Sequence, residues 1–147
     1  MSHRTKIHFR FYNTVLDIDY VESLWFIIVD QKQGWYKLDN IPFFLTSYAV
    51  GDIVYAEMED GQLLVKDVVQ ESGNSTLQII CYQPSQTALI QQKLEALGCS
   101  WEESHLPDYF SVNVPSEVTY KPIKSYLKKA EKQKLLSYKE ACLAHTL

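Results

Sequence analysis

The stretch IVYAEMEDGQLLVKDVV, residues 53–69, decides how the first half of the chain folds. Two apolar-rich runs, residues 53–58 and 63–69, flank Glu59-Asp60-Gly61. An Asp-Gly pair supplies the positive φ angles that a tight hairpin turn requires. The stretch therefore predicts two antiparallel strands joined by a short turn.

Similar runs lie on both sides of this hairpin. Residues 7–11 alternate apolar and polar side chains, which is the period of a half-buried strand. Residues 24–29 are continuously apolar and predict a strand covered on both faces. Residues 35–38 follow a Gly-containing turn and predict its hairpin partner, which Pro42 ends because proline has no N–H to donate. Residues 77–82 predict the next strand.

The pattern then changes to helical spacing. Ser85 is expected to cap a helix that Gly98 ends. Residues 99–103 and 110–114 predict two more strands. Pro122 is tolerated in the first turn of a second helix.

A third helix is expected near the end of the chain. Ser137-Tyr-Lys-Glu140 has the spacing of a capping box, so a short helix is predicted to begin there and run toward Leu143. The order of elements predicts an α+β fold. A strand-rich half, forming an antiparallel sheet or a partly open barrel, precedes a β-α-β-β-α-α half. With 147 residues, we expect a single compact unit made of a β-rich subdomain, 1–83, and a helix-containing subdomain, 84–147.

Composition indicates an ordered globular protein with an uneven charge. Apolar residues make up 46% of the chain and charged residues 22%, which excludes wholesale disorder. The net charge is −4. Residues 1–120 carry seven Lys or Arg against sixteen acids, giving −9, and residues 121–147 carry seven Lys against two Glu, giving +5. Such a split bears on the choice of partners more than on the fold.

The sequence favours a cytoplasmic location. No apolar run approaches the ~18 residues of a membrane span, and no apolar segment of a signal peptide follows the first ten residues. The three cysteines are an odd number at unmatched spacings, which is typical of reduced thiols. No cofactor, metal or membrane association is expected.

Several motifs together resemble a known family. They are Glu22-Ser-Leu-Trp25, the block from Gly34-Trp-Tyr-Lys to Pro-Phe-Phe44, Gly51-Asp-Ile-Val54, and Tyr138-Lys-Glu-Ala-Cys142. The chain resembles the bacterial family named domain of unknown function 4265 (DUF4265). The resemblance implies a free-standing bacterial cytosolic protein and names no catalytic residue.

Two candidate reaction centres have structural alternatives. Asp39, Asn40 and Asp52 could converge in a ligand cleft or could bond the backbone of turns, where such residues are common. Cys99 and His105 could form a nucleophile and its base, but a buried inert thiol needs no further geometry.

Lysines dominate the predicted second helix. Lys121, Lys124, Lys128 and Lys132 would form one ridge opposite an apolar stripe. The ridge is either a solvated outer face or a phosphate-contacting surface for RNA or DNA. The segment contains no arginine, the usual reader of base edges.

Our leading hypothesis is a non-enzymatic protein-binding module, in its concrete form an immunity or inhibitor protein that binds and blocks a basic bacterial toxin. Acidic clusters would steer such a partner; they are Glu57, Glu59, Asp60, Glu102 and Glu103. The alternatives are a nucleic-acid-binding accessory domain that uses the lysine ridge, and an enzyme whose site is dispersed along the sequence.

Overall fold

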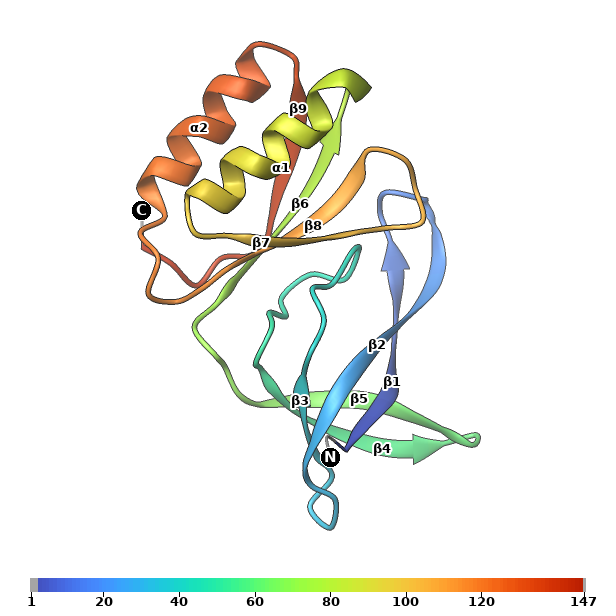
Figure 1. Cartoon of the computed structure of the whole chain (residues 1–147). Helices are drawn as coiled ribbons and strands as arrows, with labels where there is room; N and C mark the ends of the chain where they lie inside the picture. The colour runs from blue at the N-terminus through green and yellow to red at the C-terminus, as the bar shows by residue number, and fades with distance from the viewer. Residues whose placement is uncertain (1–2, 147) are drawn as a thin grey trace.

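A small closed barrel forms the first half of the chain. The computed structural model describes residues 3–146. In the barrel each strand pairs antiparallel with the next, and β1 closes it by a parallel pairing with β5 (Figure 1). The strands are β1 (Arg4–Asn13), β2 (Ile18–Asp30), β3 (Trp35–Leu38), β4 (Ile53–Glu59) and β5 (Gln62–Gln70).

The barrel interior follows from the alternation of side chains along each strand. Ile7 and Phe9 of β1 face Leu24 and Phe26 of β2 inside the barrel, and all four are buried. The run 24–29 is a strand, but the prediction that it is covered on both faces is wrong, because a barrel has only one inner face and Trp25 is 37% exposed. The predicted turn of the β4–β5 hairpin is confirmed: Asp60 and Gly61 have φ angles of 50° and 78°.

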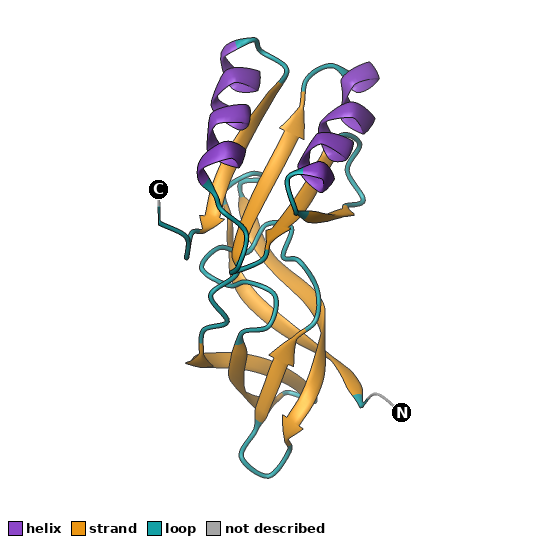
Figure 2. Ribbon diagram, turned by 60° about the vertical axis from the view of Figure 1, so that its left-hand side comes forward, coloured by secondary structure: helices purple, strands orange, loops and turns teal. Residues whose placement is uncertain are grey.

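The second half is a four-stranded sheet with both helices on one face (Figure 2). Its strand order is β7-β8-β6-β9. The strands are β6 (Ser75–Cys81), β7 (Ser100–Glu103), β8 (Tyr109–Val114) and β9 (Leu136–Cys142), and the helices are α1 (Thr87–Ala96) and α2 (Lys121–Lys132), with a 3-10 turn at Pro84–Gln86. The α+β class is thereby confirmed.

Two local predictions in this half are wrong. Ser137 and Glu140 lie in β9 rather than in a third helix, because β9 pairs with β6 and places Leu136 in the core. A capping box is a local signal, and burial against a neighbouring strand overrides it. Ser85 does not cap α1, which begins at Thr87 without a side-chain cap.

A loop, residues 39–52, joins the barrel to the other face of the sheet. Side chains of the sheet donate hydrogen bonds to carbonyl oxygens of this loop. Gln78 Nε2 donates to Leu45 O (2.8 Å), and Tyr109 Oη donates to Phe43 O (2.7 Å). The sheet is therefore apolar where it meets the helices and polar where it meets the loop.

From the barrel side, one carboxylate holds the same loop. Glu22 of β2 is 5% exposed. Its two oxygens accept the backbone N–H groups of Phe43 (2.6 Å), Phe44 (3.0 Å) and Leu45 (3.0 Å). These three hydrogen bonds tie the loop to β2.

Replacing this carboxylate should destabilise the fold. We expect Glu22→Ala to lower the free energy of unfolding by about 3 kcal/mol or more, because three buried N–H groups lose their acceptor. Urea titration followed by tryptophan fluorescence measures the change. The exposed Glu117→Ala serves as control and should stay within about 0.5 kcal/mol of wild type. Equal effects of the two substitutions would contradict this role.

Candidate functional site

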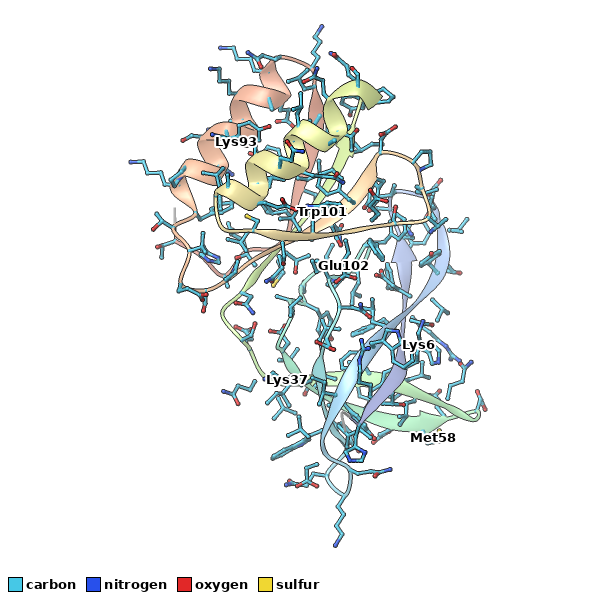
Figure 3. The ribbon with its side chains drawn as sticks, viewed as in Figure 1. Lys6, Lys37, Met58, Lys93, Trp101 and Glu102 are labelled. Atoms are coloured by element: carbon cyan, nitrogen blue, oxygen red, sulfur yellow. The ribbon has the colours of Figure 1, made fainter. Side chains whose placement is uncertain are left out.

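Three of the predicted partner-binding acids lie together at the tip of the β4–β5 hairpin. Glu57, Glu59 and Asp60 are all exposed there. Met58 lies between them and is 67% exposed, the highest value among the large apolar side chains of the described residues. Figure 3 shows Met58 at the end of the hairpin that lies away from the helices. The tip thus presents an exposed apolar side chain next to acidic residues in the sequence, with Glu57 and Glu59 on the opposite face of the strand from Met58.

A hollow of about 360 Å³ lies beside this tip, between the hairpin and the β2–β3 turn. Tyr36, Tyr55 and Leu63 line it together with Met58. The turn comes so close to β4 that a Cβ atom on Gly34 would lie 2.9 Å from the carbonyl oxygen of Ala56. The hollow has two tyrosines in its walls, and its charged lining residues are Glu57 and Lys32, so it suits a protruding side chain of a protein partner.

The acids at the tip differ in whether a neighbouring cation offsets their charge. Lys66 Nζ lies 2.5 Å from the carboxylate of Glu59; the hydrogen bond and the charge of Lys66 lower the pKa of Glu59 and offset its charge. Tyr55 Oη donates to Glu57 (2.6 Å), which raises the pKa of Tyr55 but leaves the charge of Glu57 in place. Among the described residues, no ion pair involves Glu57 or Asp60.

The other two predicted acids lie elsewhere. Figure 3 shows Glu102 in the middle of the molecule, far from Met58. Its carboxylate accepts the amide of Asn40 (3.1 Å) and the backbone N–H of Ile41 (3.0 Å), and burial raises its pKa. Glu102 therefore holds the loop rather than a partner. Glu103 lines a different cleft, next to α1.

The candidate cleft residues of the loop are occupied by internal bonds. Asp39 pairs with Arg4 (3.2 Å), and Asn40 Oδ1 accepts the backbone N–H of Trp25 (2.6 Å). Asp52 is buried and accepts the backbone N–H groups of two residues, Ala49 and Ser72. These contacts hold turns in place, as the structural alternative for these residues requires.

The thiols and histidines do not form a nucleophilic pair. Cys99 is buried, and burial raises its pKa to about 11. A close Ser–His pair does exist, between Ser75 Oγ and His145 Nδ1 (2.5 Å), which lie 70 residues apart and so left no signal in the sequence. Ser75 is fully buried and accepts the N–H of Ala144 (2.9 Å), so this pair anchors the C-terminal segment.

A basic stripe on the barrel also escaped prediction. Arg4, Lys6 and Arg10 are exposed on the outer side of β1, because Ile7 and Phe9 take the inward-facing positions of the strand. The guanidinium of Arg4 and the ammonium of Lys6 lie 4.9 Å and 5.1 Å from the ring centroid of Trp25. Two of these charges thus contact an aromatic side chain of the barrel itself.

Three of the four lysines of the predicted ridge on α2 are exposed. Lys121, Lys128 and Lys132 are exposed. Lys124 instead lies 2.8 Å from the carboxylate of Glu140 on β9, which also accepts the hydroxyl of Tyr120 (2.6 Å). Lys124 therefore joins α2 to the sheet and leaves three lysines free to contact phosphate.

The Glu140 cluster predicts a pH dependence. Burial opposes ionisation of Glu140, but the hydrogen bonds from Lys124 and Tyr120 outweigh it and lower its pKa. A carboxyl group with a lowered folded pKa stabilises the fold above its unfolded pKa, about 4.3. This contribution is lost as the pH falls through the folded pKa.

We therefore expect Glu140→Gln to lower the free energy of unfolding by about 1 kcal/mol at pH 7 and by progressively less below pH ~4.3. Urea titrations between pH 3 and pH 7 measure the difference from wild type. The exposed Glu131→Gln on α2 is the matched control and should show no such trend. A difference independent of pH would contradict the assignment.

Comparison with known proteins identifies the family. The model of the family described as Domain of unknown function (DUF4265) matches residues 22–138, most of the chain. The chain belongs to this family. The match runs from Glu22 of β2 to Tyr138 of β9, so it includes parts of both the barrel and the sheet and leaves out β1.

One solved structure is similar over the whole length. It is a crystal structure of a hypothetical protein from Neisseria gonorrhoeae, 26% identical, with a TM-score of 0.81. The similarity covers 99% of this chain and 98% of that chain. A search among curated proteins finds no match.

Two further findings concern the described residues. Within residues 3–146, no helix is both long and apolar enough to span a bilayer. Over the same range, no group of three or more His, Cys, Asp or Glu side chains is placed to hold a metal ion.

Proposed function

We propose that this protein is a non-enzymatic binding protein that captures a basic protein partner, and that in a bacterial cytoplasm it acts as an immunity or inhibitor protein against a toxin. The observation that carries the proposal is the tip of the β4–β5 hairpin. There, Met58 is 67% exposed and lines a hollow of about 360 Å³, and three exposed acids flank it in the sequence.

The chemistry of this tip matches that of a binding surface. Methionine is enriched in interface cores, and its flexible thioether adapts to the partner's shape. The free charges of Glu57 and Asp60 would attract a basic surface over a distance of about one Debye length, ~8 Å at physiological salt. Carboxylates on the rim raise the association rate more than they raise affinity.

The shape of the hairpin also favours binding over chemistry. The Asp60-Gly61 turn has the two positive φ angles of a tight hairpin, so the tip is a defined structure rather than a flexible loop. A preformed tip loses little conformational entropy on binding. A basic active site of a toxin is the kind of concave, positively charged surface into which such a tip fits.

The charge asymmetry at the tip gives a sharp test. Once affinity capture has identified the partner, Glu57→Lys/Asp60→Lys should slow association by about 10-fold or more at low salt, and Met58→Ala should speed dissociation. Glu59→Lys should slow association less, because Lys66 already offsets the charge of Glu59. Biolayer interferometry measures both rates.

The matched control is Glu71→Lys/Glu117→Lys, which makes the same change in net charge outside the hairpin and should leave the association rate near that of wild type. If the control slows association as much as the hairpin variant, net charge rather than this surface governs binding, and the proposal fails.

A second candidate function rests on α2. Three exposed lysines project from one helix and are in no ion pair among the described residues. They are Lys121, Lys128 and Lys132. This ridge could contact the phosphates of RNA or DNA.

If it does, changing these three lysines to Gln should flatten the log–log salt dependence of single-stranded RNA or DNA binding by about 2, since each phosphate contact contributes about 0.7. Fluorescence anisotropy between 50 and 200 mM salt measures the slope. Lys124→Gln is the control and should leave the slope unchanged, because Lys124 contacts Glu140. An unchanged slope in the triple variant would rule this function out.

A further inference from the structure

A second cleft, of about 270 Å³, lies between α1 and the loop that joins β7 to β8. Figure 1 shows α1 lying over the sheet on the side of β7. The cleft is distant in the chain from the β4–β5 hairpin, so it is a site separate from the proposed partner surface. Its size is near the lower limit of about 300 Å³ for small-molecule sites, which suits one small ring system.

The loop that forms one wall is held in a fixed shape. Ser104 Oγ donates to the carbonyl oxygen of Tyr109 (2.6 Å) and accepts the N–H of Leu106 (3.1 Å). The carbonyl oxygen of Asp108 accepts the backbone N–H of Cys81 (2.8 Å). A ligand would meet a preformed wall and would have little loop entropy to remove.

Gln91 is the feature that points to a ligand. Its side chain lines the cleft from α1, is only 6% exposed, and its Nε2 makes no hydrogen bond within the described residues. A buried amide N–H₂ without an acceptor destabilises the fold. Gln78, by contrast, places its Nε2 between two loop carbonyl oxygens. Gln91 therefore has an unsatisfied donor, and that donor is covered, behind the wall of the cleft.

The carboxylates of the cleft are acceptors, beside the imidazole of His105. Thr87 Oγ1 donates to one carboxylate oxygen of Asp108 (2.8 Å), which fixes that carboxylate, and no donor among the described residues contacts the other oxygen. Glu103 adds a second carboxylate. No Lys or Arg lines the cleft. An anionic ligand is therefore disfavoured, whereas a ligand with N–H donors is favoured.

A ligand of this cleft therefore needs to be small. It needs an acceptor for Gln91 and donors for the carboxylates of the cleft. Aromatic walls are present in His105, Tyr109 and Phe110. An amino-substituted nucleobase carries an exocyclic N–H₂ beside a ring nitrogen acceptor, the edge that a Gln side chain reads with two hydrogen bonds. We propose that this cleft binds such a base, adenine or cytosine, free or as its nucleoside.

The first test is isothermal titration calorimetry with cytosine and a series of purines. Adenine and adenosine should bind saturably. Purine, which lacks the amino group, and hypoxanthine, in which a carbonyl oxygen replaces that donor by an acceptor, should bind about 10-fold more weakly or not at all. AMP should also bind more weakly than adenosine, because its phosphate meets the carboxylates. Equal binding of purine and adenine, or no binding of adenine and cytosine, would overturn the proposal.

The second test uses two adjacent glutamines of α1. Gln91→Leu should weaken adenosine binding by about 10-fold or more and should raise Tm by about 2–4 °C, because it removes an unpaired buried amide. Gln92, which is exposed, is the matched control, and Gln92→Leu should change neither value. The rise in Tm shows that the variant folds. Unchanged adenosine affinity in Gln91→Leu would overturn the assignment.

A short adenine oligonucleotide distinguishes a free base or nucleoside from a base that is part of a nucleic acid. It should bind no more tightly than adenosine, because no basic side chain lines the cleft to receive its phosphates. Tighter binding of the oligonucleotide, lost in Gln91→Leu, would overturn the assignment to a free base or nucleoside.

Discussion

The buried carboxylate of Glu22 is the interaction on which the arrangement of the two halves depends. Residues 39–52 form an irregular loop between barrel and sheet, and irregular backbone leaves N–H and C=O groups without ladder partners. Glu22 accepts three of those N–H groups from the barrel side. Gln78 and Tyr109 donate to the carbonyl oxygens from the sheet side. The loop is therefore bonded to both halves, and neither half can shift without breaking hydrogen bonds of buried groups.

This constraint explains why the sheet has two faces of different chemistry. Along β6, Leu77 and Ile79 face the helices, whereas Thr76 and Gln78 face the loop, and all four are buried. Apolar side chains on the loop face would bury backbone carbonyl oxygens without donors. The buried polar residues where the sheet meets the loop are thus needed for folding. The groups free for binding lie at the ends of the molecule.

Local signals in the sequence predicted local structure well. The Asp60-Gly61 pair predicted the hairpin, and Pro122 marked the start of α2, because turn geometry and helix starts depend on neighbouring residues. The third helix at Ser137 failed for the complementary reason: β9 exists through its pairing with β6, some 60 residues earlier. Of the candidate site, the acidic tip could be predicted because it lies within one hairpin.

The rest of the candidate site depends on long-range contacts that residue types do not reveal. Glu102 was predicted as a partner contact, but the loop residues Asn40 and Ile41, about 60 positions earlier, bond its carboxylate. Gln91 gave no signal, because its role depends on the absence of a partner in a cleft formed by a separate loop. A glutamine is ordinary on a helix until its burial is known.

Burial keeps two of the three thiols in their protonated form. A catalytic acid or base works best with a pKa near the working pH. Burial moves the pKa of Cys99 to about 11, and that of the half-exposed Cys142 also to about 11, so both thiols stay protonated at neutral pH. Protonated thiols are weak nucleophiles. The carboxylates of Glu57 and Asp60 lie exposed at the end of the hairpin instead, and an exposed charge there can act on a partner before contact is made.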